Sequence, residues 1–501
     1  MKTQKSMLNF LVNALSLPIT AILGIILTKM TIQYYGSDIN GLNVVITQII
    51  TVILVLEGGL GVALNAILYK PYVDQHTRHI KEILAAAKNV FRIIGAAFSI
   101  VAFIIALLLP KFLNSELDAQ LITILFFLAF LPTSIYLYFS LKRKALYDVS
   151  QSEYIISCIS IITNILGQIF AIISIYLQCE ITVVRFWIMF FLVLRSILIW
   201  WNSKKRYREY SFDNGKKDYS FLKSMPSVIS IKVTSLIYGT APVLYISFAL
   251  GTMVASVYSV YNMVFGLIKT FIYAFVNAPF NAFGQMLTNN DKLNDTREKF
   301  YVYEILTIMI LTILLTTCVL VIIPFVELFT KGVKDINYID PTIALLLFLI
   351  TFFEIIHIPS GILMQVTGKF KENKIMQYIT TIVLLVSMFA LANNFSLYGI
   401  LLANLLGNLV LSFLEIRFTH KQILKTDSLL IYKTIGINLL VSFLLIYAIK
   451  PFVVIDNYVS FILNSGILLI VIGTFFYIVN FLFFKSYISM ANILIVRIIK
   501  R

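Results

Sequence analysis

Ten ionisable side chains stand inside long apolar runs of this 501-residue sequence, where a charge is costly unless it is paired or hydrated. The basic ones are Arg92, Arg185, Arg195, Lys232 and Lys269, and the acidic ones are Glu57, Glu304, Glu327, Glu354 and Glu415. Buried ammonium and guanidinium groups attract anions far more strongly than the same groups in water. Buried carboxylates can hold a coupling ion. The pattern therefore indicates anion binding and ion exchange, and no covalent chemistry.

Depth within each apolar run separates the basic candidates. Lys269 stands about 16 residues into its run and Lys232 about 11 into its own, too deep for easy escape to the headgroups. Arg195 and Arg185 share a third run. We expect Lys269, Lys232, Arg195 and Arg185 to bind an anionic substrate. The other interpretation of Lys269 is that Glu57 or Glu354 neutralises it as part of the structure.

Three residues are candidates for binding a coupling proton or sodium ion. Glu57 lies near the middle of its run, and three of the next four residues are glycines, which permit close helix approach. Glu354 precedes His357 by three residues, so the two side chains share a helix face. Glu57, Glu354 and His357 are therefore predicted to carry coupling. A buried lysine partner for Glu57, and a packed pair at a kink for Glu354 and His357, stay open as alternatives.

The composition identifies the solvent around these residues as lipid. Hydrophobic residues make up 59% of the chain, charged residues 13%, and the mean hydropathy is +0.91. A soluble domain is about a quarter charged. The net charge of +16 is scattered in short clusters, which excludes a nucleic-acid-binding module and suits anionic lipid. Three scattered cysteines provide neither a disulfide framework nor a metal site.

Apolar windows of about 20 residues predict about fourteen transmembrane helices. They cover residues 8–34, 42–69, 88–109, 120–141, 155–177, 182–201, 221–249, 253–279, 302–326, 341–365, 374–393, 397–416, 432–450 and 459–483. With the N-terminus inside, the cytoplasmic segments hold 30 Lys and Arg and the outer segments hold 5. The positive-inside rule therefore places both termini in the cytoplasm.

A basic loop divides the chain, and the two parts resemble each other weakly. We predict an all-α membrane protein with a six-helix lobe at 1–201, a cytoplasmic linker at 202–220, a second six-helix lobe at 221–416, and two accessory helices with a tail at 417–501. At an offset of 215, Gly24 meets Gly239 and Gly36 meets Gly251. At an offset of 217, KALYDVSQSEY meets GILMQVTGKFK. The lobes would be parallel repeats related by a pseudo-two-fold axis.

Several motifs resemble those of Wzx-type polysaccharide flippases. The second predicted span reads YYGSDINGLNVVITQIITVILVLEGGLGVALNAILYKP, and VYSVYNMV, AFGQML, FTKGVKDINYIDP and TGKFKENK follow in order. The chain is similar to the Gram-positive branch of this family, which belongs to the superfamily of multidrug exporters, oligosaccharidyl-lipid flippases and polysaccharide exporters. The resemblance covers most of the chain and is loosest after about residue 424.

The resemblance implies a flippase of the bacterial cytoplasmic (inner) membrane that has no enzyme activity. Its substrate would be an undecaprenyl-pyrophosphate-linked oligosaccharide, moved to the outer leaflet by alternating access for capsule-like or O-antigen-like polymers. Membrane lipid and other polysaccharide-assembly proteins would be its partners. No cofactor is expected beyond a coupling proton or sodium ion. The alternatives are a membrane-embedded polymerase or glycosyltransferase, and a cation-coupled multidrug exporter with the same fold.

Overall fold

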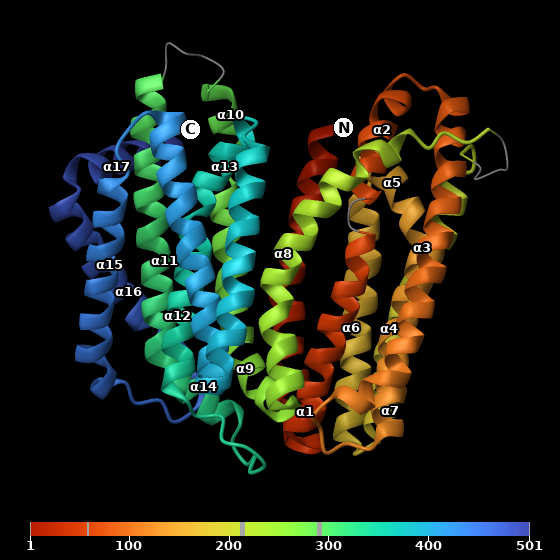
Figure 1. Ribbon diagram of the computed structural model, residues 1–501, viewed down its shortest axis with the longest axis horizontal. Coiled ribbons are helices and arrows are strands. Elements are labelled where there is room, and N and C mark those ends of the chain that lie inside the picture. Colours follow the sequence, from red (N-terminus) through yellow and green to blue (C-terminus); the bar gives the residue numbers. More distant parts are fainter. Residues whose placement is uncertain (1, 58–59, 211–215, 288–292, 500–501) are drawn as a thin grey trace. The chain divides into compact units, whose positions relative to one another are not determined.

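The computed structural model describes residues 2–57, 60–210, 216–287 and 293–499, and it leaves aside the side chains of 2–17, 223–232, 494–499 and a few single positions. The described residues are helical and contain no β-strand. They form two compact units, coloured along the chain in Figure 1. Unit 1 comprises Met1–Ser256 with Gly332–Ile336, and unit 2 comprises Val257–Lys331 with Asn337–Arg501. The lobe boundaries expected from sequence stay predictions.

Unit 1 contains eight helices and the start of a ninth among its described residues. They are α1 (Lys2–Ile53), α2 (Leu60–Val73), α3 (Thr77–Phe112), α4 (Ala119–Ile135), α5 (Leu141–Val149), α6 (Glu153–Tyr176), α7 (Ile181–Arg206), α8 (Met225–Tyr245) and the first turn of α9 (Thr252–Asn277). A π-helical turn at Tyr136–Ser140 joins α4 to α5, and another at Ile246–Leu250 follows α8.

The described residues of unit 2 form the rest of α9 and eight further helices. They are α10 (Phe280–Leu287), α11 (Leu293–Phe329), α12 (Pro341–Ile356), α13 (Ile358–Val366), α14 (Phe370–Phe418), α15 (Leu429–Ile449), α16 (Tyr458–Phe483) and α17 (Lys485–Ile499). A π-helical turn at Thr419–Leu424 follows α14. Within this unit α11 packs against α12, α15 and α16, so it forms the centre of the bundle.

Every span predicted from hydropathy overlaps helical residues in the described part of the chain. Eleven helical stretches of the described chain are long and apolar enough to cross a membrane, and Leu236–Leu250 is a shorter apolar helix. The difference from fourteen arises because α1 joins the first predicted span to part of the second, α14 joins two predicted spans, and the span predicted at 221–249 is represented by the shorter helix Leu236–Leu250. A helix of 52 residues such as α1 would be about 78 Å long if it were straight, far more than a bilayer needs. The fold is that of a multi-pass membrane protein.

A single non-helical residue divides each of these two long helices. Gly36 interrupts α1 with φ 85° and ψ 170°, and Ser396 interrupts α14 with φ 47° and ψ −125°. Close to the second break, a Cβ on Gly399 would lie 2.2 Å from the carbonyl oxygen of Leu391. Only glycine fits such an approach. The predicted boundaries between spans, at 34–42 and 393–397, are therefore tight turns.

The glycines paired at an offset of 215 adopt the same backbone conformation. Gly36 has φ 85° and ψ 170°, and Gly251 has φ 98° and ψ 164°. Each stands between a helix and the next one, where L-residues other than glycine are strained. The match of both angles supports the internal repeat.

The segments paired at an offset of 217 end their helices with the same hydrogen bonds. After α5, Ser152 N donates to Tyr147 O at 2.8 Å; after α13, Lys369 N donates to Met364 O at 2.8 Å. Gln151 and Gly368, which are 217 residues apart, both have positive φ, 56° and 73°. This is the Schellman ending, in which a left-handed residue closes the last turn. Two weakly similar sequences therefore specify one turn.

A buried carboxylate fixes the region around the first of these turns in unit 1. Asp38 is 6% exposed and accepts hydrogen bonds from Ser115 Oγ at 2.9 Å, from the Glu116 amide at 2.9 Å and from Thr252 Oγ1. The Ser37 amide and hydroxyl donate to Asp335, at 2.6 and 2.8 Å. Three segments distant in sequence thus converge on the turn at Gly36.

We expect Gly41→Ala to destabilise unit 1 strongly. A Cβ on Gly41 would lie 1.8 Å from the carbonyl oxygen of Thr252, so backbone must move, and overpacking of this kind costs about 1–3 kcal/mol or more. The melting temperature of the purified protein in detergent measures the effect. Gly24→Ala, on the same helix with no atom within 4 Å of its Cβ, is the matched control and should melt no lower than wild type. Equal melting temperatures for both variants would contradict the close approach.

Candidate functional site

Lys269, the deepest of the predicted cations, is paired in unit 2. Its Nζ atom on α9 lies 2.5 Å from Oε2 of Glu354 on α12, and the side chains are 18% and 29% exposed. Tyr273, one helical turn after Lys269, donates its hydroxyl to Oε1 of the same carboxylate at 2.9 Å. Glu354 is therefore neutralised on both oxygens, and Lys269 presents no uncompensated charge in this arrangement.

The expected pairing of Glu354 with His357 is wrong, because each side chain bonds elsewhere. His357 stands where α12 ends and α13 begins, and Pro359 follows at the start of α13. His357 therefore stands at the junction of two helices, not within one continuous helix. Its Nδ1 atom lies 2.9 Å from Oε2 of Glu415 on α14.

Glu415 is 2% exposed, and a glycine leaves room for it. A Cβ on Gly361 would stand 2.9 Å from Glu415 Oε2, so a larger residue on α13 would displace the carboxylate. A second pair of the same kind joins Glu304 on α11 to His420, whose Nε2 lies 2.8 Å from Glu304 Oε2. These three pairs are the least exposed ion or acid–histidine pairs in the described part of unit 2.

Arg185 and Arg195, both on α7 in unit 1, are half-buried and have no carboxylate partner among the described residues. Their Nε atoms are buried and make no hydrogen bond there. The Arg195 guanidinium lies over the ring of Tyr136, 5.3 Å from its centroid. A cation–π contact of this kind offsets only part of the cost of removing a guanidinium from water. The charge of each guanidinium is therefore not balanced by a carboxylate in the described part of the chain.

The remaining candidates are less well defined. Glu57 is the residue at which the second predicted span breaks, after a 3₁₀ turn at Leu54–Leu56 and shortly before α2. It is therefore at a helix interruption, whereas the sequence placed it within a continuous helix. Glu57 and Arg195 both act electrostatically on Tyr136. Lys232 belongs to α8, but its side chain lies outside the described residues.

Positions 217 residues apart carry different chemistry in the two units. In unit 1, Arg143 Nη1 donates to Ser203 Oγ at 2.9 Å; 217 residues later stand Ser360 and His420, which both bond to Glu304 in unit 2.

Arg195 and Tyr136 are in contact in unit 1, and the residues 217 positions later, Ser412 and Phe353, are in contact in unit 2. There the hydroxyl of Ser412 donates to the carbonyl of Phe353 at 2.6 Å. One half of the chain therefore carries cations where the other carries an acid–histidine network or a neutral hydroxyl.

Solved structures of membrane transporters share this fold. The lipid II flippase MurJ in an inward closed conformation matches with a TM-score of 0.71 at 16% identity, covering 95% of this chain and 99% of the other. An inward-facing multidrug resistance MATE family transporter of the MOP superfamily gives 0.66 at 14% identity, covering 82% and 98%. A MOP superfamily transporter from Pyrococcus furiosus, described as having a binding pocket of reversed polarity, gives 0.56 at 14%, covering 84% and 95%.

At these identities the similarity establishes the fold. No protein-family model matches the chain, and no curated protein matches it.

Proposed function

We propose that the protein is a flippase for a lipid-linked oligosaccharide whose phosphate groups are negatively charged. The observation that supports this most directly is the pair of guanidiniums, Arg185 and Arg195, without carboxylate partners in the described part of unit 1. A pyrophosphate group supplies the missing charge, and bidentate hydrogen bonds from guanidinium to phosphate are among the strongest in proteins. The fold shared with MurJ is consistent with such a cargo.

Lys269 and Glu354 provide a way for cargo and coupling ion to influence each other. An arriving phosphate competes with Glu354 for Lys269, and a carboxylate that loses its lysine gains from binding a proton. Substrate binding at Lys269 and ion uptake at Glu354 are then linked, because Lys269 exchanges the carboxylate for the phosphate and Glu354 exchanges the lysine for the coupling ion. Lys232, Glu57 and His357 stay candidates for cargo and coupling-ion binding.

We further propose that the chain resides in a bacterial cytoplasmic membrane with both termini inside, since its Lys and Arg residues gather in the segments on that side. The cargo would be carried on undecaprenyl pyrophosphate for a surface polysaccharide. Other polysaccharide-assembly proteins would act before and after it.

A multidrug exporter is the second candidate, because MATE transporters share the fold. Two guanidiniums without a carboxylate partner among the described residues count against it for cationic drugs, since like charges repel in a low-dielectric interior.

Loss of the gene tests both candidates in one experiment. A flippase-deficient strain should accumulate a lipid-linked oligosaccharide in the inner leaflet, identified by lipid extraction and mass spectrometry, and should lose its surface polymer. Expression of the wild-type chain should restore the polymer. A strain with normal surface polymer that instead retains a cationic dye such as ethidium would favour the multidrug exporter.

A further inference from the structure

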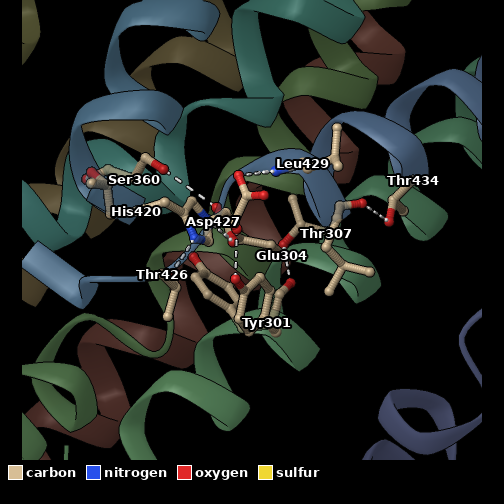
Figure 2. A network of polar contacts seen from close by, with 12 residues as sticks. Tyr301, Glu304, Thr307, Ser360, His420, Thr426, Asp427, Leu429 and Thr434 are labelled. Atoms are coloured by element: carbon tan, nitrogen blue, oxygen red, sulfur yellow. Dashed lines mark hydrogen bonds and ion pairs between the residues drawn. The ribbon is translucent and has the colours of Figure 1, made fainter. Parts of the chain in front are cut away.

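The Glu304–His420 pair is the most deeply buried ionisable pair in the described part of the chain. His420 is 0% exposed, Glu304 is 2% exposed, and Nε2 lies 2.8 Å from Oε2. Figure 2 shows the two side chains facing each other at the centre of a polar network. Neither residue is needed for the proposed binding of cargo. Burying this acid and base costs more free energy than burying two apolar side chains of similar volume, so their presence requires an explanation.

The remaining polar atoms of the pair are also satisfied. Ser360 Oγ on α13 donates to Glu304 Oε1 at 3.3 Å, and His420 Nδ1 lies 3.0 Å from Thr426 Oγ1. Thr419 Oγ1 donates to the carbonyl of Ser360 at 3.2 Å. The network therefore joins α11 and α13 to the segment of residues 419–428, which connects α14 to α15 and includes a left-handed residue, Lys425.

Other ionisable groups around the pair come from every element that packs on it. Those that contact it or act on it electrostatically are Tyr301 and Tyr303 on α11, Tyr432 on α15, and, one contact further away, Tyr487 on α17 and Asp427 of the connecting segment. The nearest cation on α11, Arg297, donates its Nε–H to the carbonyl of Leu424 at 2.5 Å. The phenols are neutral near pH 7, so the charge of the pair is set by its own protons.

One proton decides whether this buried pair is neutral. With the proton bound, the imidazolium donates through Nε2 to Glu304 and through Nδ1 to Thr426, and the pair has no net charge. Without it, a carboxylate and a neutral imidazole remain, with a net charge of −1 in a site of low dielectric. Because an uncompensated charge is costly to bury, the closed arrangement is more stable with the proton bound than without it.

We propose that Glu304 and His420 form a binding site for one proton, and that its occupancy holds the 419–428 segment against α11 and α13. The site is separate from the predicted cargo and coupling residues. Loss of the proton opens the segment, and the loop between the last helix of the predicted second lobe and the two accessory helices becomes accessible. The inference goes beyond the flippase proposal and does not depend on the identity of the cargo.

Hydrogen exchange of the full-length protein in lipid nanodiscs, without substrate, tests the site. Exchange of the 419–428 peptide is measured across a pH series and normalised to the exchange of the same peptide when unfolded. We expect protection in the wild type to fall by about tenfold or more from mildly acidic to alkaline pH. In Glu304→Gln, which has no carboxylate to compensate an imidazolium at His420, protection should not change with pH. Glu298→Gln, an exposed change on the same helix, should behave like wild type.

The wild-type measurement alone can overturn the proposal, even if Glu304→Gln fails to fold. Protection of 419–428 that is independent of pH in the wild type would exclude a proton-controlled contact. A pH response that persists unchanged in Glu304→Gln, or in His420→Gln where the imidazole is absent, would also exclude it. None of these outcomes bears on whether the protein transports a lipid-linked oligosaccharide.

Discussion

Lys269→Ala is expected to abolish transport and to leave Glu354 buried without its cation. The Lys269–Glu354 pair is largely buried, and removing one partner of a fully buried pair costs about 3–5 kcal/mol, so a smaller loss of stability is expected here. Surface polymer, measured on whole cells at matched levels of protein in the membrane, reports transport. Normal polymer in this variant would remove Lys269 from the proposed mechanism.

The reversed pair separates a structural role from substrate binding. The variant that combines Lys269→Glu with Glu354→Lys keeps the ion pair but exchanges its ends between α9 and α12. If Lys269 binds phosphate from its own position, the double variant should recover the melting temperature of wild type and remain inactive. Recovery of both stability and transport would mean that the pair serves the fold alone.

Replacing Arg185 or Arg195 of unit 1 should have opposite effects on stability and on transport. Arg195→Met and Arg185→Met remove a guanidinium that has no carboxylate partner in the described structure, so the cost of its burial disappears. The melting temperature should rise, while transport should fall by more than about tenfold because the anion loses its partner.

Lys205→Met is the matched control, because Lys205 is exposed near the end of the same helix. It should change neither property. A lower melting temperature in Arg195→Met together with wild-type transport would show that the guanidinium is a structural group. The thermal measurement is made on the purified protein and the transport measurement on cells, so each can contradict the proposal independently.

Hydropathy predicted the helices because the bilayer imposes a length and an apolar composition on each span. It also placed the turns at Gly36 and Ser396, where two spans follow each other almost without a loop. It could not locate the interruption at Glu57 or the π-helical turns, since both depend on packing against neighbouring helices.

The acid–histidine pairs could not be predicted from the sequence. Glu304 and His420 are 116 residues apart, and no pattern within either helix says which faces meet. The sequence showed Glu304 and Glu415 among the acidic residues of the apolar runs, but neither was included in the predicted site. A signal was nevertheless present. The chain has only four histidines, and His357 and His420 stand within or directly after apolar runs, where an imidazole requires a partner.

The two halves share two turns, one at Gly36 and Gly251 and the other at Gln151 and Gly368. The side chains at equivalent positions nevertheless differ between the halves. A synthetic chain assembled from the first half twice should still form every bend, yet its second copy would bring more guanidiniums into the membrane and no Glu304 or His420. Such a chain would have two electropositive interiors and no site in the second to exchange a proton. The turns are common to both halves, so the side chains at equivalent positions, and not the turns, make the halves electrically unlike.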